Sequence, residues 1–207
     1  MGIIKQGILG GFQNKVGPVI GSSWKGIATM RAMPISVANP RTAAQVTNRS
    51  KFSHASKMGS VLLAGIIKPL WDRFAQAESG FNAWLKQAVG AFNIDGTVDA
   101  TKLVMSKGTV ALPAQISVTW QGTGSSWAVN WNPELFGDAL PNDQLYFVGL
   151  NTVTRGVFVA PAVAVRSAGS VSIQAETFVR GAGIVAFVMF RRADGSRVSN
   201  SFLDTSA

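Results

Sequence analysis

Hydrophobic and polar positions follow three different patterns along the chain, and the first pattern covers residues 1–38. Short apolar runs there are broken by glycine and polar residues, which predicts strands at 8–12, 16–20 and 24–30. Glycine permits the positive φ angles of turns but weakens strands, so this segment buries little by itself. We therefore expect a β arm that becomes ordered by docking onto its own domain or a neighbouring subunit.

A disordered tail is the alternative interpretation of this segment. Disordered segments are poor in aromatic and β-branched residues, whereas this one contains Phe12, Trp24 and the pair Val19 and Ile20. The composition favours the ordered arm.

The second pattern, at residues 39–94, carries the signals of helices. Thr42 and Gln45 have the spacing of a capping box, in which each side chain bonds the other residue's backbone amide. We expect the helix that they begin to run over residues 43–58, with Gly59 in the left-handed position that follows a helix.

Two further helical segments complete this block. The apolar run 60–67 predicts a buried helix that Pro69 ends or kinks, and a short helix can follow over 70–77. Ser79 is placed to cap a helix over 80–89. The apolar positions of this last helix recur at helical spacing and are Phe81, Trp84, Leu85 and Ala88.

The third pattern begins after residue 96 and consists of short runs rich in β-branched and aromatic residues with turn residues between them, including 122–124. The runs that predict strands are 102–111, 115–121, 126–131, 144–151, 157–161, 170–175, 184–191 and 198–203. About seven strands in roughly a hundred residues are typical of an immunoglobulin-like or fibronectin-like sandwich. The most apolar run, 184–191, predicts a central strand.

The chain is therefore expected to be an α+β protein with three parts. A basic, glycine-rich β arm and linker covers residues 1–38, a small helical block covers 39–94, and an antiparallel β-sandwich domain covers 101–207.

The charge of the chain is distributed unevenly. The first 71 residues contain nine Lys or Arg and no Asp or Glu, and the remaining 136 contain ten basic and ten acidic residues, so the net charge of +9 arises in the first third. Charged residues make up only 14% of the chain, against about 25% in average proteins. Such a surface is expected where other subunits cover it, and a merely Ala- and Gly-rich domain is the alternative.

Candidate catalytic chemistry is sparse. The chain has no cysteine, the single histidine is His54, and the nucleophile pattern Gly-x-Ser-x-Gly does not occur. His54 is interpreted as a surface or packing residue. Asp95 and Asp99 are interpreted as turn formers rather than calcium ligands. The longest aliphatic run, 61–67, is too short to span a membrane. We expect no enzyme, no cofactor and no membrane span.

The basic third remains as the candidate contact region. Its cations recur along a path and are interleaved with aromatic residues, which suits a phosphate backbone or an acidic protein surface. A basic surface that serves solubility alone is the alternative. The candidate contact residues are Lys15, Lys25, Arg31, Arg41, Arg49, Lys51 and Lys57, with Trp24 available for stacking on bases.

The N-terminal sequence resembles a known family through the signature GILGGF…KVGPVIGSSWKGI…NPRT, at residues 7–12, 15–27 and 39–42. The family consists of uncharacterised proteins of Bacteroidota genomes and of their phages and prophages. The resemblance implies no catalytic residue. It implies a phage-linked setting, which favours a component of a virion or of an assembly.

Three functions remain open at this point. The first is a structural protein of a phage-related particle or another repetitive assembly, virion or cytoplasmic, whose arm docks onto neighbouring copies in a homo-oligomer. The second is a sequence-independent nucleic-acid-binding or packaging-associated protein. The third is a surface adhesion module, which rests on the sandwich alone.

Overall fold

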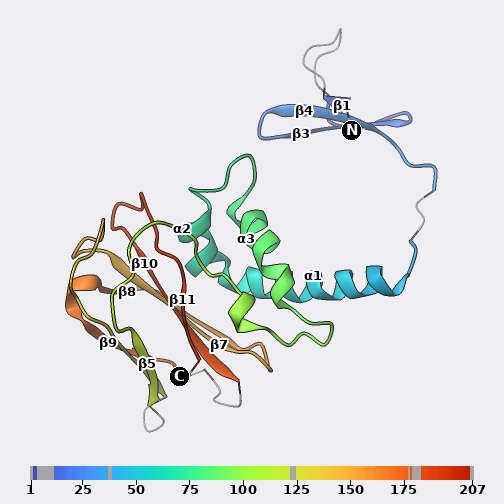
Figure 1. Cartoon of the computed structure of the whole chain (residues 1–207). Coiled ribbons are helices and arrows are strands. Elements are labelled where there is room, and N and C mark those ends of the chain that lie inside the picture. Colours follow the sequence, from blue (N-terminus) through green and yellow to red (C-terminus); the bar gives the residue numbers. More distant parts are fainter. Residues whose placement is uncertain are drawn as a thin grey trace. The chain divides into compact units, whose positions relative to one another are not determined.

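The computed structural model describes residues 2–3, 12–36, 39–121, 125–176, 178 and 183–205. The chain divides into two compact units, Met1–Arg41 and Thr42–Ala207, which are described separately below. The fold is α+β, with N-terminal strands, helices, and C-terminal antiparallel sheets that form a sandwich (Figure 1). This confirms the expected fold class.

The first unit contains a four-stranded antiparallel sheet in the order β1-β4-β3-β2. Its strands are β1 (Gly2–Ile3), β2 (Asn14–Val16), β3 (Val19–Trp24) and β4 (Ile27–Ala32). The β3–β4 loop has two residues, Lys25 and Gly26, which both have positive φ (48° and 81°), as tight hairpin turns require.

The expected strands at 16–20 and 24–30 have the wrong bounds, because the chain turns at Gly17 and Pro18 and β3 then runs from Val19 to Trp24. Gly21 lies inside β3, paired with Met30 of β4 and with Asn14 of β2. Glycine is needed there because the Phe12 ring packs against it, and a Cβ would lie 2.6 Å from Phe12 Cδ2. Apart from Phe12, the expected strand at 8–12 lies outside the described residues, as does the expected turn at 122–124.

The second unit begins with a helical path that is continuous from residue 43 to residue 71. It consists of α1 (Ala43–Leu62), a π-helical turn (η1, Leu63–Ile67) and α2 (Lys68–Trp71). The capping box is confirmed, because Gln45 N donates to Thr42 Oγ1 and Thr42 N donates to Gln45 Oε1, each at 3.4 Å.

The prediction that α1 ends at Gly59 is wrong. Gly59 is a buried residue inside the helix, where a Cβ would lie 2.7 Å from Trp84 Cζ3 and 2.8 Å from Phe81 Cε2. Because Gly59 has no side chain, α1 can pack closely against the helix that carries Phe81 and Trp84. The helical path continues through Pro69 to Trp71. The π-helical turn ends two residues before Pro69, which lacks an N–H and crowds the preceding turn.

The third helix, α3 (Gly80–Ala88), starts where the sequence predicts. Ser79 is its N-cap and accepts a hydrogen bond from Asn82 N at 3.3 Å. Short 3₁₀ turns follow at η2 (Val89–Ala91) and η3 (Ala100–Lys102). The expected helix over 70–77 is wrong, because helical structure ends at Trp71 and a turn follows.

Two antiparallel sheets complete the unit. One has the order β11-β10-β7-β8, with strands β7 (Gln144–Asn151), β8 (Val157–Val165), β10 (Ile184–Arg191) and β11 (Phe202–Asp204). The other has the order β5-β6-β9, with strands β5 (Ser117–Gln121), β6 (Ser126–Asn130) and β9 (Ser170–Gln174). A 3₁₀ turn (η4, Arg166–Ala168) joins β8 to β9 and so links the two sheets.

The expected strand at 102–111 is wrong. Its backbone runs beside residues 198–201 without a regular ladder. Two bonds are backbone to backbone, from Val110 N to the Val198 carbonyl and from Ser201 N to the Ser106 carbonyl, and others use side chains, as where Met105 N donates to Ser201 Oγ. The single bridge found there pairs Val110 with Ser199. For the same reason the last strand is shorter than expected, since β11 begins only at Phe202.

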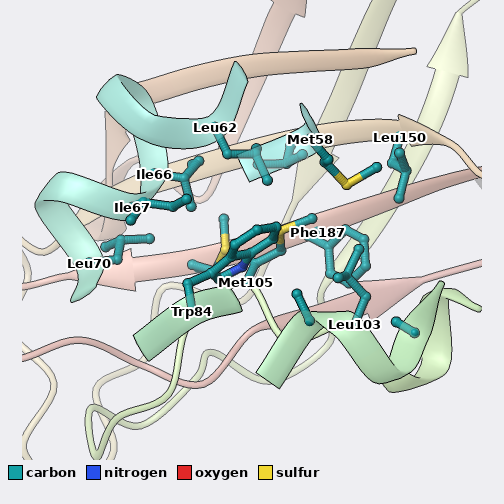
Figure 2. Close-up of a cluster of buried hydrophobic side chains, with 14 of the residues drawn as sticks. Met58, Leu62, Ile66, Ile67, Leu70, Trp84, Leu103, Met105, Leu150 and Phe187 are labelled. Atoms are coloured by element: carbon teal, nitrogen blue, oxygen red, sulfur yellow. The ribbon is translucent and has the colours of Figure 1, made fainter. Parts of the chain in front are cut away.

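The β7–β10 pair is buried on both faces. One face packs against the helices and contributes Tyr146, Val148, Leu150, Val185, Phe187 and Met189. The other face packs against the smaller sheet and contributes Leu145, Phe147, Ile184, Ala186, Val188 and Phe190. Figure 2 shows the first core, in which Leu62 of α1 and Ile66 of η1 lie close to Trp84, with Phe187 of the sheet alongside.

A buried ion pair holds one end of the sandwich. Arg166 is fully buried, donates from Nε to Asp143 Oδ2 at 3.3 Å and from Nη2 to the Ala111 carbonyl at 2.7 Å, and lies over the Phe190 ring at 4.5 Å. A charge at this depth is tolerated only because it has such partners.

The helix contact predicts a clear effect of mutation at Gly59. Gly59→Val should lower the free energy of unfolding by about 1–3 kcal/mol, because the new side chain overpacks the contact with Trp84 and Phe81. Urea unfolding followed by circular dichroism measures this. Gly90→Ala is the matched control, since nothing lies within 4 Å of its Cβ position. Equal stability of the two variants would contradict the close contact.

Candidate functional site

The register of the arm sheet places three of the predicted contact residues on one face. Lys15 pairs with Ile20, and Ile20 pairs with Arg31, so these three side chains point to the same side. Trp24 lies four residues after Ile20 in β3 and shares that face by alternation. Lys15, Trp24 and Arg31 are all exposed. Two cations and one aromatic ring therefore share one side of a small sheet.

Both faces of the arm also expose apolar side chains. Trp24 and Ile27, which pair next to the loop, are 58% and 51% exposed on the first face. Val16 and Met30 are 61% and 42% exposed on the opposite face. Among residues 12–36, only Gly21 is buried. The arm thus has no core of its own in the part that the structure describes.

The other candidate cations are more scattered. Lys25 lies in the β3–β4 loop, and Arg41 lies at the end of the first unit. Arg49 and Lys57 are exposed and lie about 80° apart around α1, away from its buried stripe. Lys51 is half-buried. The arm residues belong to one compact unit and the α1 residues to the other.

A cationic pocket lies beside α1 in the second unit. It combines His54, Lys57, Met58 and Val61 from the helix with Arg155 and Val157 from the β7–β8 hairpin. Arg155 Nη1 contacts His54 Nδ1 at 2.7 Å. The sequence gives no local signal for this site, because its two halves are about a hundred residues apart. His54 was expected to be a surface or packing residue. It packs against Arg155, a cation that lines the same pocket.

The acidic side chains of the second unit are mostly engaged within it. Lys102 and Thr101 bond Asp99 and lower its pKa to about 2. Arg197 lies 2.7 Å from Asp138 and holds the pKa of that carboxyl below its usual range. Lys86 forms an ion pair with Glu78 at 2.7 Å. The net charge of +9 arises in the first 71 residues, which include the arm and α1.

The fold and these surfaces define an α+β protein with a sandwich, a cationic pocket and an exposed basic arm. A family of unknown function, DUF6266, matches residues 11–203, and the chain belongs to this family. No curated protein and no solved structure matches the chain. No helix within the described ranges is both long enough and apolar enough to cross a membrane.

The depressed carboxyl pKa values predict sensitivity to acid. A carboxyl whose pKa is lower in the folded state stabilises the fold above its unfolded pKa near 3.8, and this contribution is lost as pH falls toward the folded value. The melting temperature should therefore fall between pH 4 and about 2. Thermal melts should show a shallower fall for Asp99→Asn than for wild type. Glu176→Gln, at an exposed carboxyl without a described partner, should keep the wild-type slope.

Proposed function

We propose that this chain is a non-enzymatic structural protein of a repetitive assembly, and that its basic arm docks onto a neighbouring copy. The observation that supports this most strongly is the arm sheet, which exposes Trp24 and Ile27 on one face and Val16 and Met30 on the other. Isolated small sheets need a covered apolar face for stability. Because each of these side chains is already about half-buried, burying the rest of it contributes roughly 1 kcal/mol.

Charge complementarity favours the body of a second copy as the partner. The first 71 residues contain no acidic side chain, and all ten Asp and Glu lie after them. Two arms would repel each other, since like charges opposed at an interface cost affinity. An arm on the second unit of a neighbour would instead meet exposed carboxylates that have no ion-pair partner among the described residues, such as Glu176. Docking of an arm on the second unit of the next copy joins the copies head to tail, and such interfaces form rings or filaments.

The setting that fits this proposal is a phage-related particle, virion or cytoplasmic. It is supported by the resemblance of the N-terminal signature to proteins of Bacteroidota phages and prophages. The low charge content of 14% also suits a surface that other subunits cover. A surface adhesion module would rest on the sandwich architecture alone, which is a weaker argument.

Nucleic-acid binding is the second candidate, and one observation favours it. Lys15, Arg31 and Trp24 share a face of the arm sheet. Cations that hold phosphates beside an aromatic ring that stacks on bases are the usual elements of sequence-independent binding to single strands. Both functions are compatible in a particle protein whose arm faces a genome.

Assembly should depend on the exposed apolar pair of the arm. Size-exclusion chromatography with light scattering should show the full-length protein as an oligomer at high concentration. Trp24→Ser combined with Ile27→Ser should shift it toward the monomer, because this change removes the apolar contact area while leaving every charge in place.

Two further samples sharpen this test. Deletion of residues 1–36 should give the same shift, and Leu135→Ser should not, although Leu135 is 51% exposed on a loop of the second unit. A full-length protein that stays monomeric, or an oligomer that the deletion leaves unchanged, rules out the docking arm.

Nucleic-acid binding should depend on salt. The dissociation constant for single-stranded DNA, measured by fluorescence anisotropy, should rise steeply from about 50 to 200 mM salt. Lys15→Gln combined with Arg31→Gln should reduce the slope of log K against log salt by about 1.4, since two phosphate contacts are lost. Trp24→Leu should weaken binding without changing the slope. No binding at about 50 mM salt would exclude this function.

A further inference from the structure

The pocket beside α1 has the composition of a site for a small organic anion. Its cavity of about 290 Å³ is lined by the polar side chains of Lys57, His54 and Arg155 and by the apolar side chains of Met58, Val61 and Val157. Ligand pockets commonly combine apolar walls with a few polar groups that fix orientation. This pocket belongs to the second unit, so the inference is independent of the arm.

The hairpin turn that carries Arg155 is held in a defined shape. Asn151 Oδ1 accepts hydrogen bonds from Val153 N at 3.0 Å and from Thr154 N at 2.9 Å. Arg155 N donates to the Asn151 carbonyl at 2.8 Å, and Arg155 itself has a φ of 65°, which is uncommon outside glycine. Thr152 anchors the same turn through Gly183, because its N and its Oγ1 each donate to that carbonyl at 2.9 Å.

The guanidinium of Arg155 is also held in place. Arginine nitrogens only donate, so His54 Nδ1 accepts the 2.7 Å hydrogen bond and the ring carries its proton on Nε2. Gly96 lies against the pair with a φ of 89°, and a Cβ there would lie 2.9 Å from His54 Cε1. Ser50 Oγ fixes this loop to α1 by donating to the Ile94 carbonyl at 2.9 Å.

Arg155 and Lys57 form no ion pair in the part of the chain that the structure describes. Asp95 is near enough for its charge to interact with His54, but its Oδ1 accepts bonds from Thr97 N at 2.9 Å and Thr97 Oγ1 at 2.8 Å. An ordered arginine with no carboxylate partner is suited to an external anion.

From these contacts we propose that the pocket binds a carboxylate attached to a short apolar chain. The Arg155 nitrogens not bonded to His54, together with Lys57, bind the carboxylate. Met58, Val61 and Val157 contact the aliphatic part. Hexanoate, a carboxylate on a short aliphatic chain, is the probe chosen for this cavity of about 290 Å³. The apolar wall distinguishes this ligand from inorganic phosphate, which would use the cations alone.

Isothermal titration calorimetry of the full chain at low salt tests this proposal. Hexanoate should bind saturably at one site, and hexanamide, which keeps the chain but lacks the charge, should not bind. Inorganic phosphate should bind more weakly than hexanoate. The proposal is overturned if hexanoate gives no saturable heat up to about 20 mM, or if hexanamide or phosphate binds as well.

Variants separate a binding site from a structural contact between α1 and the hairpin. Arg155→Lys keeps the charge but loses the planar fork, and it should weaken hexanoate binding about tenfold, as should Lys57→Gln. His54→Asn keeps an acceptor for Arg155 and should cost less. Lys68→Gln, an exposed cation on the same helical path but outside the pocket, should bind like wild type. Wild-type binding by Lys57→Gln and Arg155→Lys would overturn the proposal, and Lys57→Gln tests it even if the hairpin variant unfolds.

Discussion

The structure of the second unit depends on one constraint: the paired strands β7 and β10 are buried on both faces. Side chains alternate along a strand, so each strand supplies two separate cores. In the register found, Phe187 lies opposite Val148 on the helix side, and Val188 lies opposite Phe147 on the side of the smaller sheet. A slip of one residue would exchange the two sets completely. The helices are therefore a layer of the same fold and cover a face that water would otherwise reach.

The same constraint explains what the sequence could predict. Strands buried on both faces appear as continuous apolar runs, and the predicted bounds of β7 and β10 match the observed ones. The caps at Thr42 and Ser79 were also predictable, because a cap is a local interaction between neighbouring residues. Gly59 was misinterpreted because the reason for a glycine at this position does not lie in the neighbouring sequence. It serves contact with Trp84, 25 positions away, and nothing in its own neighbourhood distinguishes a close helix crossing from a helix end.

The candidate sites differ in predictability for similar reasons. Counting charges along the sequence locates the basic third, but only the strand register shows that Lys15, Trp24 and Arg31 share a face. The pocket was not predictable at all. Arg155 and His54 meet only because β7 and β8 pack beneath α1, and each residue alone resembles an ordinary surface residue. Helix α1 thus serves two purposes, since one stripe with Leu62 enters the core and another with Lys57 lines the pocket.

The two units differ in how far their apolar side chains are buried and their charges are paired, and this difference bears on function. In the second unit, apolar side chains fill two cores, and carboxylates such as Asp99 and Asp138 have cations beside them. The arm contains no carboxylate that could neutralise Lys15 or Arg31, and its described residues include only one that is buried. An ordered sheet with exposed apolar side chains and uncompensated charge gains free energy from a surface that supplies both an apolar contact and negative charge. The first 71 residues contain no Asp or Glu. The negative charge that binds the arm therefore has to come from a surface outside the arm.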